Sequence, residues 1–216
     1  MEVLLGSLVT ILTAIMVEYF RRPKLAIMII DPIDLNFKSP RPAQSIRSLR
    51  LKVFNKALPF GAKWMSRKTA AQCHGFISFH HLDGQNIFGR VMPIRWTNTP
   101  EQVPITFEID GKTFSYFDRL IFGLTQRPNI PPGESEEIDV AVRLDNDEEC
   151  YGWSNESYFS VPKWRNEDWK LSKGRYLVFV TIISEGEKRT GLFRLLNDVP
   201  KNSCRLESAL PNDSIS

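Results

Sequence analysis

An uncharged apolar run near the start of this 216-residue chain is the feature that most restricts its fold. The run extends from Val3 to Val17 and continues through Glu18, Tyr19 and Phe20. As a helix, residues 3–20 would measure about 27 Å, close to the roughly 30 Å thickness of a bilayer's hydrocarbon core. We therefore predict one transmembrane helix, which with its basic flank makes up residues 1–24.

The charges on either side of the run predict an orientation. Glu2 is the only charged residue before it, and three basic residues follow it: Arg21, Arg22 and Lys24. Because basic flanks stay in the cytoplasm, we expect a single-pass protein of the cell membrane with its N-terminus outside and its C-terminal domain cytoplasmic. Residues 21–68 carry 12 Lys or Arg against two Asp, which indicates anionic membrane lipid as a partner.

Two other interpretations of the run fit less well. A secretory signal peptide has a basic start and a small-residue cleavage site, and this chain begins Met1-Glu2 with bulky residues after the run. A helix of a globular domain usually has a polar face, whereas the polar residues of this run are only Ser7, Thr10 and Thr13.

The rest of the chain is rich in short segments that alternate with period two. Leu49, Leu51 and Val53 alternate with polar residues, and residues 137–144 repeat the pattern. Such segments are typical of half-buried strands. Further strands are expected at 25–30, 75–81, 87–94, 103–109, 176–183 and 191–196, separated by turns at Asp110-Gly111, Pro131-Pro132-Gly133 and Glu185-Gly186-Glu187. This pattern predicts a mainly β protein with an antiparallel β-sandwich domain over 25–200 and a flexible tail over 201–216.

Two segments resemble parts of known β-sandwiches. Residues 171–176, followed by Leu177-Val178-Phe179-Val180, resemble the penultimate strand of immunoglobulin-like domains, in which a Tyr near the strand start closes a tyrosine corner. Residues 51–56, with Ala70 and Ala71 later, look like the second strand and following loop of bacterial adhesion-type sandwich modules. The resemblance implies an immunoglobulin-like antiparallel β-sandwich and identifies no functional family.

Signatures of catalysis, metal binding and nucleic-acid binding are missing from the sequence. The three cysteines form no CxxC pair, and neither a nucleophile elbow nor a phosphate-binding glycine loop occurs. On a strand, His80 and His81 point to opposite faces, and the acidic stretch 145–149 lacks the glycine of a calcium loop. We therefore predict no catalytic residue, no metal, no cofactor and no nucleic-acid partner.

Aromatic residues are concentrated between Cys150 and Trp169. Aromatic side chains on a long connection of a rigid sandwich are common in recognition surfaces, although such a segment can also fill the end of the sandwich. The candidate partner-binding residues are Tyr151, Trp153, Trp164 and Trp169. We expect a membrane-anchored, non-catalytic interaction or scaffolding module that binds another protein. The alternatives are an exported carbohydrate- or ligand-binding sandwich of reversed topology and, with less support, a metal-dependent hydrolase.

Overall fold

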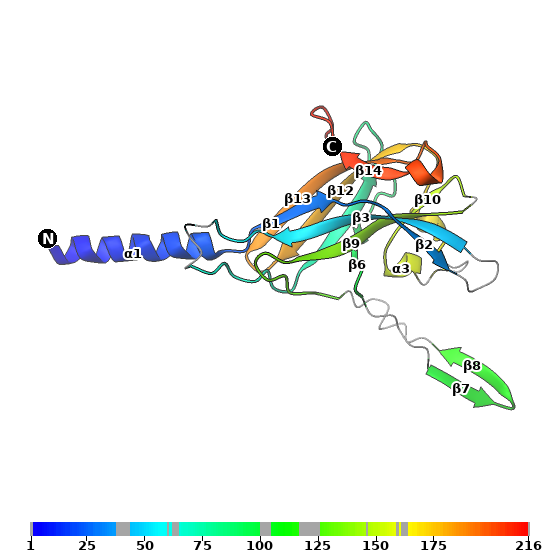
Figure 1. The fold of residues 1–216 in the computed structure, drawn as a ribbon, viewed down its shortest axis with the longest axis horizontal. Helices are drawn as coiled ribbons and strands as arrows, with labels where there is room; N and C mark the ends of the chain where they lie inside the picture. Colours follow the sequence, from blue (N-terminus) through cyan, green and yellow to red (C-terminus); the bar gives the residue numbers. More distant parts are fainter. Residues whose placement is uncertain are drawn as a thin grey trace.

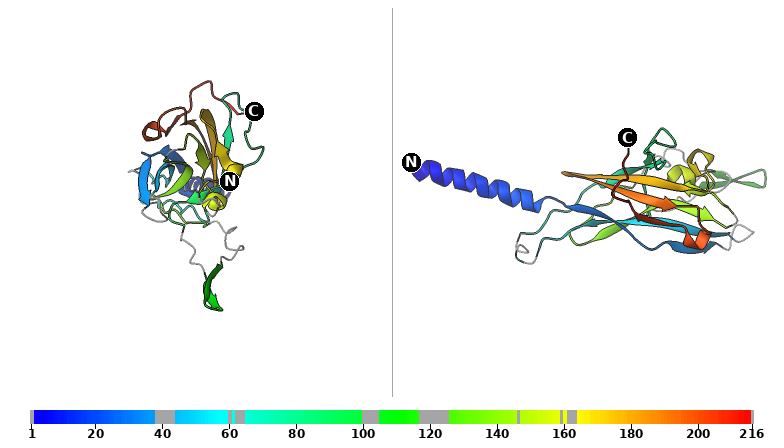
Figure 2. Two further views of the ribbon diagram at one scale, coloured as in Figure 1. Left: turned by 90° about the vertical axis from the view of Figure 1, so that its right-hand side faces the viewer. Right: turned by 90° about the horizontal axis from the view of Figure 1, so that it is seen from above.

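The structure is a computed structural model that describes residues 2–37, 44–59, 61, 65–99, 105–116, 126–145, 147–158, 160 and 164–215. Helix α1 (Glu2–Arg21) comes first, and most of the remaining regular structure is antiparallel strand. In Figure 1, α1 extends from one end of a strand-rich body, and the views in Figure 2 show the same arrangement. The predicted mainly β, sandwich-like antiparallel fold is confirmed, and it is compatible with an immunoglobulin-like fold.

Two sheets make up the body. In the first, the strand order is β1-β3-β9-β10-β11, with β2 also paired to β3 and β6 also paired to β9. Its strands are β1 (Leu25–Ile29), β2 (Ile33–Phe37), β3 (Gln44–Asn55), β6 (Arg95–Trp96), β9 (Ser135–Leu144), β10 (Cys150–Gly152) and β11 (Lys170–Leu171). The order in the second is β14-β13-β12-β4-β5. Its strands are β4 (His74–His80), β5 (Met92–Pro93), β12 (Arg175–Ser184), β13 (Glu187–Leu196) and β14 (Arg205–Ser208).

A separate hairpin consists of β7 (Ile105–Ile109) and β8 (Lys112–Tyr116), which pair with each other. Its turn is the predicted Asp110-Gly111, where both residues have positive φ, at 52° and 74°. Glycine tolerates this conformation and Asp is among the few other residues that do, so the pair suits a tight hairpin. The short helical segments elsewhere are α3 (Asn155–Tyr158), η2 (Glu167–Trp169) and η3 (Lys201–Ser203).

The main hydrophobic core lies between the two sheets and is built from alternate strand residues. Leu49, Leu51 and Val53 of β3 are fully buried, as the sequence pattern predicts. The second sheet contributes Ile77 and Phe79 from β4 and Val178, Val180 and Ile182 from β12. The intervening residues of β3, Arg50 and Lys52, lie on the outer face of the first sheet, which sets up the site described below.

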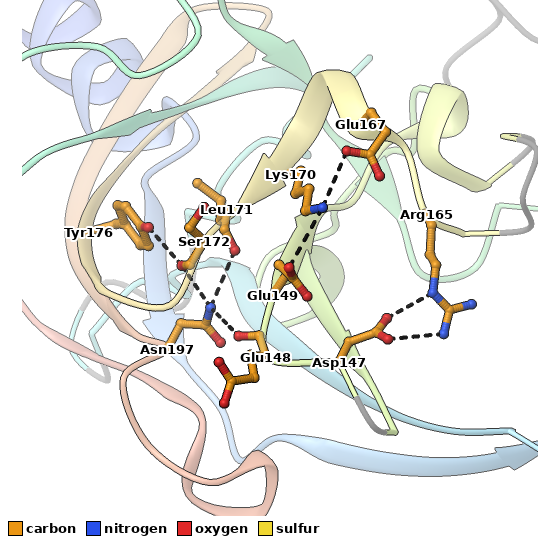
Figure 3. A network of polar contacts seen from close by, with 10 residues as sticks. All are labelled: Asp147, Glu148, Glu149, Arg165, Glu167, Lys170, Leu171, Ser172, Tyr176 and Asn197. Atoms are coloured by element: carbon orange, nitrogen blue, oxygen red, sulfur yellow. Dashed lines mark hydrogen bonds and ion pairs between the residues drawn. The ribbon is translucent and has the colours of Figure 1, made fainter.

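Each end of the sandwich is fixed by a buried asparagine. Asn197 donates from Nδ2 to the carbonyl oxygens of Glu148 and Ser172 at 3.2 and 3.0 Å, and Figure 3 shows these contacts. At the same end, the Tyr176 hydroxyl donates to the Ser172 carbonyl oxygen at 2.7 Å, the contact expected of a tyrosine corner. Asn55 lies at the end near α1, where its Oδ1 accepts a hydrogen bond from the Lys24 backbone N–H at 3.1 Å.

The predicted transmembrane anchor over 1–24 is wrong. Within the described part of the chain, α1 included, no helix combines the length and hydrophobicity that crossing a bilayer requires. The uncharged stretch of α1, Val3 to Val17, measures about 22 Å at the α-helical rise, against about 30 Å for the hydrocarbon core. Glu18 then forms an ion pair with Lys68 of the strand-rich body, so the last turns of α1 are tied to the domain. The predicted orientation and cell-membrane location depended on that span, and the structure does not test them.

Two other segments differ from their predicted form. Of residues 87–94, only Met92–Pro93 is strand, because Asn86 Oδ1 accepts from the Phe88 backbone N–H in a turn and Gly89 adopts φ 62°. Within residues 201–216, β14 pairs with β13, and its Leu206 is buried. Part of the segment predicted as a tail therefore forms an edge strand of the second sheet.

Candidate functional site

The aromatic segment between Cys150 and Trp169 folds over the outer face of the first sheet. β10 pairs with β9, and the Trp153 backbone N–H donates to the Val140 carbonyl oxygen at 2.9 Å, which continues that pairing. Trp153 contacts Tyr158 edge to face, with 5.9 Å between the ring centroids, and it packs against the tilted ring of Trp164 at 6.4 Å. A second, smaller hydrophobic cluster results, whose buried members are Ile46, Val142, Leu144, Tyr151, Trp153 and Trp164.

Polar contacts fix this segment to the sandwich. Arg165 forms a two-pronged pair with Asp147, at 2.8 and 3.3 Å, as Figure 3 shows. Lys170 lies between Glu149 and Glu167, at 3.6 and 3.4 Å. Two-pronged guanidinium–carboxylate pairs are both strong and geometrically specific, so the covering segment is held in one position over the sheet.

The four predicted partner-binding residues are all buried and do not share one location. Trp153 and Trp164 are 5% and 3% exposed and line a pocket on the outer face of the first sheet. Tyr151 belongs to the same cluster without lining the pocket, and burial raises the pKa of its hydroxyl. Trp169 is 1% exposed and lies in the main core, with its centroid 5.1 Å from that of Phe88. Whether any of the four contacts a partner stays a prediction.

The pocket lies between the outer face of the first sheet and the aromatic segment. It has a volume of about 310 Å³, at the lower end of the range for small-molecule sites. Its lining residues are Leu35, Ile46, Ser48, Arg50, Arg95, Thr97, Thr99, Asp139, Val142, Trp153, Tyr158 and Trp164. The covering segment contributes aromatic rings, and the sheet contributes both polar side chains, around Asp139, and the apolar Leu35, Ile46 and Val142.

Asp139 is the centre of these polar side chains. Its carboxylate accepts from Ser48 Oγ at 2.7 Å and pairs with Arg50 Nε at 2.8 Å, while Thr97 Oγ1 lies 3.4 Å from its second oxygen. The side chains of Asp139 and Arg50 are only 9% and 11% exposed. The pairing of β3 with β9 shifts register between Leu49 and Arg50, and this β-bulge aligns Arg50 with Asp139 across the ladder.

A second buried cation, Arg95 of β6, closes the pocket. Its guanidinium carbon lies 4.2 Å from the centroid of the Tyr158 ring, and its Nη1 donates to Asn155 Oδ1. A cation over an aromatic face is stabilised by the ring quadrupole, most strongly where water is excluded. Arg95 therefore fixes the Tyr158 ring and adds positive charge beside Asp139.

Trp164 also has an unusual backbone conformation. Its φ is +68°, in the left-handed region that bulky residues rarely adopt. Strained backbone of this kind occurs preferentially at ligand sites, where surrounding contacts hold it in place. The contacts of Trp164 with Trp153 and the hydrophobic cluster around it hold this conformation in place.

Of the four residues predicted from the sequence, Trp153 and Trp164 line the pocket, whereas Tyr158 and the polar residues around Asp139 were not among the candidates. Asp139, Arg50 and Ser48 lie at polar positions of alternating strands, which are usually solvated. Only the register between β3 and β9 and the covering segment show that these side chains share an enclosed space. An Asp placed between Ile138 and Val140 gives no such signal from its own neighbours in the sequence.

The predicted membrane-flank residues lie at the junction of α1 with the sandwich. The carbonyl oxygen of Arg21 accepts from the Lys68 backbone N–H at 2.7 Å, and that of Arg22 accepts from Arg67 Nη1 at 2.8 Å. Arg22 and Lys24 line a second cavity there. The two cavities are thus built from different elements.

His80, which we considered from the sequence and did not assign to a metal site, has polar partners within the domain. His80 is buried, with Nδ1 2.8 Å from the Gly84 carbonyl oxygen and Nε2 2.8 Å from Ser78 Oγ. Among the residues that the structure describes, no three His, Cys, Asp or Glu side chains are grouped closely enough to hold a metal ion.

Any assignment of function must therefore start from the pocket. Its aromatic side chains and its polar group centred on Asp139 belong to segments that are distant in the sequence. The chain matches no protein-family model, and comparisons with curated proteins and with solved structures found no match.

Proposed function

We propose that this protein is a non-catalytic binding module whose pocket holds a ligand of about the size of one sugar ring. The observation that carries the proposal is that one pocket combines the aromatic side chains of Trp153, Tyr158 and Trp164 with a polar group centred on Asp139. A sugar ring has an apolar face that packs on aromatic rings and hydroxyl groups that bond carboxylate and guanidinium groups. A volume of about 310 Å³ suits one such ring.

The charge of the pocket favours binding over hydrolysis. Glycoside hydrolysis generally needs two carboxyl groups that flank the scissile bond. Among the described residues that line the pocket, Asp139 is the only acid, and its oxygens already accept from Ser48 and Arg50. A carboxylate held in this way orients a ligand hydroxyl well and is poorly suited to transferring protons.

Recognition of a protein by the same aromatic residues has less support. The four rings are between 1% and 5% exposed, so little of their surface is open to a flat partner. A pocket ligand needs only the ring faces that line the cavity. The immunoglobulin-like assignment of the sandwich belongs to this proposal too, and the Tyr176 contact to the Ser172 carbonyl oxygen supports it.

A carbohydrate screen tests the proposal. Full-length protein is applied to an array of immobilised mono- and oligosaccharides, and the best ligand is then titrated by calorimetry. We expect Asp139→Asn to weaken binding by about tenfold, because a hydrogen bond to a charged group is lost. Thr97→Val removes a neutral hydroxyl that also lines the pocket, and we expect it to weaken binding less than Asp139→Asn does.

The matched control is Asp198→Asn, which removes the same charge from a surface pair with Arg175 outside the pocket. It is expected to bind as the unaltered protein does. Failure of every saccharide to bind saturably, or an equal loss in Asp198→Asn and Asp139→Asn, would refute the proposal. Circular dichroism of each variant separates a lost site from a lost fold.

A further inference from the structure

The second cavity, at the junction of α1 with the sandwich, combines basic and apolar side chains. It has a volume of about 570 Å³. Its basic residues are Arg22, Lys24 and Arg67, and Glu187 is the only acid among its described lining residues. The formal charge of this lining is therefore +2. In the described part of the chain none of these three cations forms an ion pair; Arg22 and Lys24 are exposed, and Arg67 is half-buried.

Arg67 carries an observation of its own. Its Nη1 donates to the Arg22 carbonyl oxygen at 2.8 Å, which holds the guanidinium in place. Its Nε is buried and has no hydrogen-bond partner among the described residues. A buried donor without a partner is costly, and such groups are rare unless a ligand or ion normally satisfies them. The Nε and Nη2 edge of a guanidinium is the edge that binds oxyanions in two-pronged fashion.

Two carbonyl groups at and just beyond the C-terminal end of α1 already have hydrogen-bond donors. A helix C-terminus carries partial negative charge on its unpaired carbonyl groups. In this protein the carbonyl oxygens of Arg21 and Arg22 already accept from the Lys68 backbone N–H and from Arg67. Glu18, the nearest acid of α1, is paired with Lys68, which lowers the pKa of that carboxyl. The three cations of the cavity therefore remain available to a ligand.

The rest of the lining is apolar. Tyr19 and Phe20 of α1 contribute rings, with centroids 5.9 Å apart, and Leu58, Pro59 and Met65 line the other side. Tyr19 and Phe20 are 68% and 45% exposed, so their faces are open to a ligand. A free inorganic ion would leave this apolar surface uncovered. A ligand with an anionic head and an apolar body covers both parts.

We infer that this cavity binds the phosphate monoester group of an amphiphilic molecule, with the phosphate on Arg22, Lys24 and Arg67 and the apolar body against Tyr19 and Phe20. A phosphate monoester carries about −1.5 to −2 charges at pH 7, which matches the +2 of the lining. The same phosphate chemistry occurs in lipid headgroups and in free inorganic phosphate, and the test distinguishes these two sources.

The test is a calorimetric titration of the full-length protein with three probes. These are dihexanoyl phosphatidic acid below its micelle concentration, dihexanoyl phosphatidylcholine at the same concentration, and inorganic phosphate. We expect saturable binding of the phosphatidic acid, weaker binding of inorganic phosphate and none of the phosphatidylcholine. If inorganic phosphate bound as tightly as phosphatidic acid, the inference that the ligand is amphiphilic would be wrong. If phosphatidylcholine bound as tightly as phosphatidic acid, the inference that the cavity selects a phosphate monoester would be wrong.

Two variants and a matched control locate the site. Lys24→Gln removes an exposed charge without touching the Lys24 backbone contact to Asn55, and we expect it to weaken phosphatidic acid binding by about tenfold. Arg67→Lys keeps the charge and removes Nε, and a similar loss is expected. Lys112→Gln removes the same charge from the β7–β8 hairpin, which lies apart from the sandwich in Figure 1, and should change nothing. Equal losses in Lys112→Gln and Lys24→Gln would overturn the assignment. Phosphatidic acid binding in this cavity and saccharide binding at Asp139 are tested with different variants. Either hypothesis can therefore be refuted without the other.

Discussion

Replacing Asn197 with alanine should destabilise the fold strongly. Asn197 is fully buried, and its Nδ2 bonds the carbonyl oxygens of Glu148 and Ser172 while its Oδ1 accepts from Arg143 Nη1 at 3.2 Å. Two neutral hydrogen bonds contribute about 1 kcal/mol each and one to a charged donor about 1.5–3 kcal/mol. The variant should therefore lose about 3–5 kcal/mol of unfolding free energy. The Asn197 backbone N–H still donates to the Gly174 carbonyl oxygen, so the substitution isolates the side chain.

Equilibrium unfolding in urea, followed by tryptophan fluorescence, measures this loss. The control is Asn202→Ala, in the exposed η3 segment five residues away, which should stay within about 0.5 kcal/mol of the unaltered protein. Asn197→Asp tests the reasoning further, because it keeps the acceptor for Arg143 and removes both donors. A loss below about 1 kcal/mol in Asn197→Ala, with an unchanged denaturant slope, would show that this amide does not hold the end of the sandwich together.

Three further predictions concern single contacts and are checked by the same urea unfolding assay. Tyr176→Phe removes the bond to the backbone carbonyl four residues upstream and should cost about 1 kcal/mol. Gly75→Ala would place a Cβ 2.2 Å from a carbonyl oxygen of β12 and should lower the unfolding free energy by about 1–3 kcal/mol. The control is Gly61→Ala, whose Cβ would have no atom within 4 Å and which should destabilise far less. Equal destabilisation by the two substitutions would contradict the steric argument. Arg194 lowers the pKa of Asp213, so this pair adds stability above the ordinary carboxyl pKa and loses it as the pH falls through the lowered one. Asp213→Asn should therefore be less stable than the unaltered protein at pH 7, and a difference that did not narrow in acid would contradict this.

Much of the fold follows from local patterns in the sequence. The alternation at 49–53 and 137–144 predicts strands that the structure contains, and Gly133 and Gly186 adopt the positive φ of their predicted turns. The pattern does not show which strands pair, because β3 and β9 lie about 90 residues apart and meet through a bulge. The apolar run of α1 predicts a helix correctly. It does not establish a membrane span, because hydrophobicity alone does not show that Glu18 forms an ion pair with Lys68 of the domain.

The candidate pocket was predictable only in part, for the same reason. The sequence alone identifies Trp153 and Trp164, because the concentration of aromatic residues between Cys150 and Trp169 is unusual for a loop. Asp139 and Arg50 are ordinary polar residues of alternating strands, and their burial arises from tertiary structure. Likewise, the role inferred for Arg67 depends on its buried Nε, which has no hydrogen-bond partner among the described residues, and the sequence alone does not show this.

The strand order also determines when the domain can form during synthesis. β3 pairs with β9, and β4 pairs with β12, about 100 residues later in the chain. At about 5–20 residues per second, a ribosome needs roughly 5–20 s to pass from the end of β3 to the end of β9. During that interval β3 can pair with β1 and β2, which precede it, but not with β9, and β4 lacks β12; pairing between such distant segments is slow in itself. The core between the two sheets therefore closes only after β12 has been made, and until then the apolar residues of β4 remain open to aggregation.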